Sequence, residues 1–257
     1  MSYAAGAAEQ RFDCVIDPAA RVSVGGPVVG LLDEVLVDRG DKVKRGQVLA
    51  RMQSEVEAAT VALDQAKADN DAELELRTTQ LALSKKKLER TQILFSKQVA
   101  TAEKLDELNA EVQVNERLAA LARLAHRVSL LELARSQKLL QQREIRSPVD
   151  GIVTERLMHG GENVHQESVI VKLARLDPLH VEVYLPVKLY PLVRIGMTGI
   201  VEPAAPIEGR FDAKISVIDQ VFDVASGTFG VRLDLPNPDG RLPGGHRCQT
   251  AFSFAGS

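Results

Sequence analysis

The stretch LELRTTQLALSKKKLERTQILF, residues 74–95, lies at the centre of the region that decides the fold, Gln53–Glu144. This region contains neither glycine nor proline. Its residues are mostly Ala, Leu, Glu, Gln, Lys and Arg, which are strong helix formers. We therefore expect helix over almost the whole region.

Apolar side chains recur every seven residues in both halves of this region. The first half carries Leu74, Leu81, Leu88 and Phe95, and the second carries Leu105, Val112, Ala119, Leu133 and Leu140, with His126 at the missing step. Such a repeat places an apolar seam on each helix for the other to bury. The periodicity lapses at residues 95–101, where Thr101 can cap a second helix. The pattern predicts an antiparallel coiled-coil hairpin with arms of roughly 42–45 residues, about 65 Å long.

The two regions that flank the hairpin are copies of each other. The segment from Gly30 to Val43 aligns with the segment from Gly151 to Val164 at a constant offset of 121 residues. Both contain short apolar runs broken by glycine turns, a pattern typical of β-strands. A repeat of about 23 residues cannot bury a core of its own. We therefore expect the copies to close into one small sandwich, with the hairpin inserted between them.

After residue 175 the chain alternates in the manner of antiparallel strands. The expected strands cover residues 180–185, 199–202, 213–221, 229–235 and 248–254, and a short helix is expected at 187–195. Near the N-terminus, a short strand is expected at 12–16, ended by Asp17 and Pro18, after a flexible lead-in of residues 1–10. The predicted fold class is α+β, elongated and multidomain.

Composition excludes several classes of function. The net charge of −3 gives no reason to expect nucleic-acid binding. No window approaches about 18 consecutive apolar residues, and the first ten residues lack the basic and apolar segments of a signal peptide. The histidines and methionines show no metal-ligand spacing, and no catalytic motif stands out. We expect no enzyme, no cofactor and no metal site.

The flanking copies follow the pattern G-x-x-x-x-V-x-V-x-x-G-D-x-V-x-x-G-Q-x-L, which resembles the two halves of a biotinyl/lipoyl domain. A lipoyl domain carries its modified lysine at the turn between these halves. The corresponding place here, residues 54–56, has no lysine and opens into the hairpin. Split lipoyl halves around a helical hairpin, followed by a β domain, resemble the periplasmic adaptors (membrane fusion proteins, HlyD family) of tripartite efflux pumps.

Two further motifs carry the resemblance. The run Arg146-Ser-Pro148-Val-Asp-Gly151 is similar to the family's entry into the second lipoyl half, where the proline ends the helix. Residues 218–244 resemble the β-barrel signature of adaptors that serve RND-type pumps, although the usual Pro-Gly-Met ending is Pro-Gly-Gly here. The resemblance implies a barrel strand at 11–20, lipoyl halves at 21–53 and 145–175, the hairpin at 54–144 and a β-barrel at 176–257. It also implies a membrane-proximal domain made from both termini, expected here to be short, absent or cut away.

The resemblance also implies partners and a location. The partners would be an inner-membrane RND-type transporter, a TolC-type outer-membrane duct and further copies of the chain. The location would be the periplasm, at the inner membrane. One alternative is an adaptor of an ABC-type exporter. A second alternative, a lipoyl or biotinyl carrier protein, is opposed by the missing lysine.

Residues of the hairpin tip are the candidate docking site. Adaptors of RND pumps resemble one another in an Arg, a Leu four residues later and a Ser eleven residues after the Arg. Here Arg90, Leu94 and Thr101 stand at these spacings, with Thr in place of Ser. Arg90 and Leu94 share one helical face. The alternative is structural: a solvated charge, a seam leucine and a helix cap.

Cys14 and Cys248 are the only cysteines, and they lie on the first and last expected strands. The resemblance implies that the two ends of the barrel contribute adjacent strands, which would bring the two thiols together. In an oxidising periplasm they would then form a disulfide. Two separate buried thiols remain the alternative.

Overall fold

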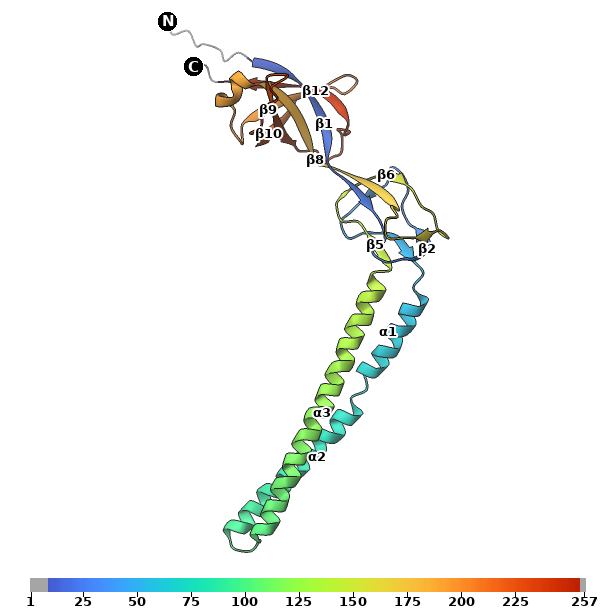
Figure 1. Cartoon of the computed structure of the whole chain (residues 1–257), viewed down its shortest axis with the longest axis vertical. Helices are drawn as coiled ribbons and strands as arrows, with labels where there is room; N and C mark the ends of the chain where they lie inside the picture. Colours follow the sequence, from blue (N-terminus) through green and yellow to red (C-terminus); the bar gives the residue numbers. More distant parts are fainter. Residues whose placement is uncertain (1–8, 255–257) are drawn as a thin grey trace. The chain divides into compact units, whose positions relative to one another are not determined.

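The computed structural model describes residues 9–254. They divide into two compact units, a β unit built from both ends of the chain and a helical unit, Gln53–Glu144. The predicted α+β class is confirmed, with a helical hairpin inserted in a β domain (Figure 1). Within residues 9–254, no helix combines the length and the apolar character needed to cross a membrane.

One part of the β unit is a closed barrel of six strands. In ring order these are β1 (Glu9–Val24), β12 (His246–Ser253), β9 (Thr198–Pro203), β10 (Phe211–Ile218), β11 (Thr228–Leu235) and β8 (Val171–Pro186). The ring closes because β1 pairs with both β12 and β8. Alternate side chains of these strands, such as Val181, Leu233 and Phe252, fill the interior. A short 3-10 helix, η1 (Val187–Leu192), follows β8.

The other part is a sandwich built from the two sequence copies. Its strands are β2 (Gly30–Val35), β3 (Lys42–Val43), β4 (Val48–Met52), β5 (Glu144–Arg146), β6 (Gly151–Arg156) and β7 (Asn163–Val164), completed by the inner halves of β1 and β8. Its core includes Leu32 and Leu49 of the first copy and Val153 and Ile170 of the second. Neither copy closes this core by itself, which is why the repeat needs its partner.

The two copies pair with each other reciprocally. Gly30 of β2 lies opposite Val164 of β7, and Gly151 of β6 lies opposite Val43 of β3. Both copies carry a β-bulge at the equivalent place, after Leu32 in one and after Val153 in the other. The offset of 121 residues in the sequence is therefore a two-fold relation in the sandwich.

The long strands β1 and β8 differ from the short strands that the sequence predicts. Each has 16 residues and runs through both the barrel and the sandwich. Pro18 was expected to end the first strand, but the register of β1 against β8 shifts between Pro18 and Ala20. Proline is tolerated at such a bulge because no ladder hydrogen bond is lost there. Of the expected lead-in, residues 1–8 lie outside the described residues, and residues 9–10 belong to β1.

The helical unit contains α1 (Glu55–Ala68), α2 (Ala72–Ser96) and α3 (Ala102–Gln141). The first arm, expected as one helix, is broken at residues 69–71. Here the side chain of Asn70 accepts a hydrogen bond from the Ala72 N–H at 3.3 Å and replaces a helical contact. The second arm is one helix of 40 residues, about 60 Å long. Figure 1 shows α1 and α2 following each other along α3.

Candidate functional site

The hairpin tip is a compact turn between α2 and α3. The carbonyl oxygen of Leu94 accepts hydrogen bonds from the N–H groups of Lys97, Val99 and Ala100, at 3.2, 2.9 and 3.4 Å. Gln98 adopts a left-handed conformation with φ of 60°, which a side chain other than glycine or asparagine rarely takes. These contacts fix the turn, so the side chains around it project from a defined backbone.

Thr101 caps α3, as its position in the sequence predicts. Its hydroxyl oxygen accepts a hydrogen bond from the Lys104 N–H at 3.3 Å. An oxygen that accepts in this way keeps its own proton for a donor role. The capping contact therefore leaves Thr101, which is exposed, with one hydrogen bond to give to a partner.

Arg90 and Leu94 lie on the exposed side of the last turns of α2. Leu94 is 44% exposed, although the structural alternative would bury it in the seam. Arg90 is exposed and forms no ion pair with any residue in the range 9–254. The tip thus presents a cation, an apolar side chain and a hydroxyl.

Three more apolar residues surround the tip, and the sequence reasoning did not single them out as a surface. Ile93, Phe95 and Val99 are all exposed. Phe95 was placed on the seam by its heptad position, but α3 has barely begun opposite the last turn of α2 and does not cover it. A lapse in periodicity beside several apolar residues was the signal available in the sequence.

Behind the tip, α2 and α3 form the apolar seam that the heptads predict. Leu81, Val112 and Ala119 are buried together, with Leu88 packed against them. Ion pairs flank this seam on its exposed edges, joining Lys85 to Glu116 at 2.7 Å and Lys87 to Glu111 at 3.6 Å. Apolar packing therefore holds the tip half of the hairpin.

Polar contacts, by contrast, join α1 to α3 and to the turn that follows α3. Glu57 accepts a hydrogen bond from the Arg143 guanidinium, which lowers the pKa of the Glu57 carboxyl. Asp64 pairs with Lys67 of the same helix at 3.0 Å and accepts a hydrogen bond from Ser136 of α3, and both contacts lower the pKa of Asp64. Both carboxylates lie on the side of α1 that faces α3, where an amphipathic helix normally places apolar groups.

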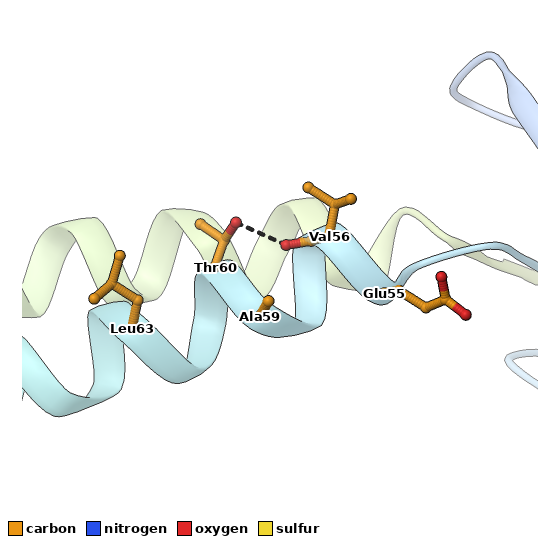
Figure 2. A pocket seen from close by; sticks show the side chains of 5 residues that line it. All are labelled: Glu55, Val56, Ala59, Thr60 and Leu63. Carbon is orange, nitrogen blue, oxygen red and sulfur yellow. Dashed lines mark hydrogen bonds between the residues drawn. The ribbon is translucent and has the colours of Figure 1, made fainter.

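The apolar face of α1 points away from α3. Val56 and Leu63 are 75% and 58% exposed, and with Glu55, Ala59 and Thr60 they line a shallow hollow. Figure 2 shows these side chains along one side of α1, with the Thr60 hydroxyl donating to the Val56 carbonyl oxygen.

Cys14 and Cys248 face each other on β1 and β12 and are joined by a disulfide, with their Cα atoms 4.8 Å apart. Both are buried in the barrel core, and the Thr250 hydroxyl donates to the Cys14 sulfur. The bond closes the barrel across its first and last strands. Within the described part of the chain, no group of three or more His, Cys, Asp or Glu side chains is placed to hold a metal ion.

Comparison with known proteins shows which proteins share this architecture. A family model described as CzcB-like, barrel-sandwich hybrid domain, matches residues 20–175. The macrolide export protein MacA of Yersinia pestis is 27% identical over 239 residues, which cover 87% of this chain and 62% of that protein. The cobalt-zinc-cadmium resistance protein CzcB of Cupriavidus metallidurans is 25% identical over 211 residues, which cover 82% and 38%. The chain therefore spans less than two thirds of either relative.

A solved structure shows the same fold. The crystal structure of MacA from Actinobacillus actinomycetemcomitans matches with a TM-score of 0.73 at 19% identity, over 96% of this chain and 78% of that one. The family model covers both sandwich copies and the whole hairpin, which is more than half of the chain. The chain thus belongs to the membrane fusion proteins that carry a CzcB-like barrel-sandwich hybrid domain.

Proposed function

We propose that this protein is a periplasmic adaptor that links an inner-membrane transporter of the RND type to a TolC-type outer-membrane duct. The observation that carries the proposal is the hairpin tip, where Arg90 and Leu94 at the end of α2 and Thr101 at the start of α3 are exposed on either side of a turn that is fixed by its own hydrogen bonds. The role is assembly and coupling of an export pathway, without chemistry of its own. The relatives named for macrolide export and for metal resistance support export as the general task.

The tip suits docking onto the ends of helices. A cation such as Arg90 is attracted to the carbonyl groups and partial negative charge at a helix C-terminus. Leu94 offers an apolar group, and Thr101 a hydroxyl donor, within the same short turn. A preformed turn loses little conformational freedom on binding, which favours affinity.

The type of transporter is a finer proposal. Residues 218–244, which resemble the barrel signature of RND adaptors, form the end of β10, β11 and the loops beside them. The alternative is the same adaptor role beside an ABC-type exporter. A carrier role is disfavoured, because the turn at residues 54–56 offers no lysine for lipoyl or biotinyl attachment.

Copies of the chain are proposed to pack side by side along their hairpins. On α3, three exposed apolar residues follow a heptad position by two residues, a rotation of about 200° that turns them away from the seam, and two more lie three residues further along the same face. They are Val114, Leu121, Leu124, Val128 and Leu131. On α2, Leu76 and Leu83 follow Leu74 and Leu81 in the same way.

Charge supports this side-by-side contact. Near the tip, α2 carries Lys86, whereas α3 carries Glu103 and Asp106, and none of the three forms an ion pair within residues 9–254, unlike Lys85 and Lys87, which pair across the hairpin. The α2 face of one copy would therefore meet the α3 face of the next with opposite charges, in a head-to-tail contact that can close a ring.

Changing Leu121→Ser and Leu124→Ser together should reduce self-association in sedimentation velocity and leave the helix content unchanged. Unchanged self-association would place the contact elsewhere.

The docking proposal is tested by reversing one charge. Arg90→Asp should change the stability of the isolated protein by no more than about 0.5 kcal/mol, because the side chain is exposed. At a desolvated contact the same change would weaken binding by about 2–5 kcal/mol. Arg127→Asp is the matched control, since Arg127 is exposed on α3 away from the tip. The two measurements are the melting temperature of the purified protein and export of a panel of toxic compounds from cells.

Normal melting with lost export for Arg90→Asp, and normal export for Arg127→Asp, supports docking at the tip. Normal export for both variants would show that the tip does not dock through Arg90. A sharp fall in the melting temperature for Arg90→Asp would make the residue structural instead.

A further inference from the structure

An apolar surface at one end of the barrel has no part in the proposed docking of the hairpin. It consists of Leu192 at the end of η1, of Ile195 just after it, and of Val221, Phe222 and Val224 in the turn between β10 and β11. We name these five residues the barrel-end surface. Ile195, Val221 and Val224 are 70%, 84% and 94% exposed, so their side chains stand almost clear of the protein.

The two segments that form this surface are held together at the barrel end remote from the sandwich. β8 runs out of the sandwich and ends at Pro186, where η1 follows. β11 begins at Thr228, directly opposite Pro186, so the turn before it lies at the same end. The Val187 N–H donates to the Gly227 carbonyl oxygen at 3.0 Å and joins the two segments.

Aromatic rings form the base of the surface. The ring of Tyr190 lies 4.9 Å from that of Phe222 and 5.2 Å from that of Phe229, both edge-on. The aliphatic side chains of the turn project beyond these rings. Phe229 is buried in the barrel core, so Tyr190 and Phe222 are the rings nearest the surface; aliphatic side chains that project beyond a tyrosine match the order found at a bilayer interface, where Tyr lies at the headgroup level.

The charges around the surface also fit a lipid headgroup layer. Lys188 and Arg194 are exposed on η1 and the loop after it. The carboxylate of Asp223 is occupied by the Ala225 N–H at 2.9 Å and the Ser226 hydroxyl at 2.8 Å, contacts that shape the turn. Lys188 and Arg194 are therefore placed to meet anionic lipid phosphates, while the Asp223 carboxylate, whose pKa these hydrogen bonds lower, keeps its charge and holds the loop.

We infer that the barrel-end surface rests on the lipid surface of a membrane, with Ile195, Val221 and Val224 inserted at the boundary between headgroups and acyl chains and Lys188 and Arg194 at the phosphates. A protein partner fits less well. Energetically dominant protein contacts are rich in Trp, Tyr and Arg seated in pockets, whereas the exposed tips here are aliphatic and protrude. The inference goes beyond the proposed adaptor function, because it assigns a lipid partner in addition to the transporter and the duct.

The test is flotation of the full chain with lipid vesicles. Vesicles of phosphatidylethanolamine and phosphatidylglycerol should carry the protein upward, and neutral phosphatidylcholine vesicles should carry less. The double variant Val221→Ser, Val224→Ser should lower the lipid partition coefficient at least tenfold, which corresponds to about 1.4 kcal/mol. The matched control is Val56→Ser, Leu63→Ser on α1, which removes similar exposed apolar groups and should leave partitioning unchanged. Circular dichroism confirms that all proteins are folded.

Three outcomes overturn the inference. The wild-type chain fails to float, or the control variant loses binding as strongly as the barrel-end variant, or the barrel-end variant binds lipid normally yet loses export in cells. The last outcome would assign the surface to a protein partner. None of these results bears on hairpin docking, which the Arg90→Asp experiment tests separately.

Discussion

The ion pair at the base of the hairpin leads to a quantitative prediction. Glu57 of α1 and Arg143, in the turn that follows α3, are joined by a charge-assisted hydrogen bond, and both side chains are largely shielded from water. Hydrogen bonds to charged groups contribute about 1.5–3 kcal/mol, and residual exposure reduces this value. We expect a coupling of about 1–2 kcal/mol between Glu57→Gln and Arg143→Gln in a double-mutant cycle. The cycle subtracts the other contacts that Arg143 makes.

A second pair in the same hairpin serves as the control. The Lys104 Nζ and the Glu107 Oε2 lie 2.6 Å apart on the surface of α3, and both side chains are well exposed. Exposed pairs of this kind contribute about 0.2–1 kcal/mol. The coupling between Lys104→Gln and Glu107→Gln should therefore be clearly smaller than that between Glu57→Gln and Arg143→Gln.

The pH dependence of the coupling between Glu57 and Arg143 provides a second test of the reasoning. Because Arg143 lowers the folded-state pKa of Glu57, the pair stabilises the hairpin fully above the unfolded-state pKa of the carboxyl. That contribution is lost as the pH falls through the lower folded-state pKa, in the range below about pH 4. The assay is urea unfolding followed by helical circular dichroism at neutral pH and near pH 3. A coupling no larger than that of the control pair, or one that persists unchanged in acid, would refute the reasoning.

Three further predictions concern stability. Cys14→Ala with Cys248→Ala should lower the melting temperature under oxidising conditions, with a loss of about 2–5 kcal/mol, and peptide mapping without reductant should recover the joined peptides from the unaltered chain. Gln98→Gly should raise the stability of the hairpin by about 1 kcal/mol, because glycine adopts the left-handed conformation without strain, and a lower melting temperature would contradict this. Gly199→Ala should destabilise the barrel by about 1–3 kcal/mol in urea unfolding, because a Cβ there would approach the Leu233 and Phe252 side chains at 2.8 Å. Unchanged stability would show that these two side chains can move aside without cost.

The sequence was informative wherever a pattern repeats. Heptads predicted the seam, and Leu81, Val112 and Ala119 are buried where the pattern places them. The offset between the two copies predicted one shared sandwich, and the pairing of β2 with β7 and of β3 with β6 follows that offset. Both patterns arise because one face of each helix or strand is buried, and periodicity in the sequence shows which residues share that face.

Other features depend on contacts that periodicity does not report. The break at residues 69–71 follows from Asn70 competing for a backbone N–H, and the cluster Asp-Asn-Asp was its available signal. The polar contact of α1 with the turn after α3 could not be predicted from composition, because it requires knowing that Glu57 meets Arg143. At the tip, Thr101 was recognisable as a cap, whereas the exposure of Phe95 depends on where α3 begins.

Docking of the hairpin tip onto an outer-membrane duct is the central claim, and site-specific photo-cross-linking in cells tests it most directly. A photoreactive amino acid replaces Leu94 at the tip or, as the control, Leu130, which is similarly exposed on α3 away from the tip. The account predicts a covalent product between the duct protein and the chain labelled at position 94, and no such product from position 130. A product with the duct from position 130 alone, or from neither position in cells that export normally, would contradict it.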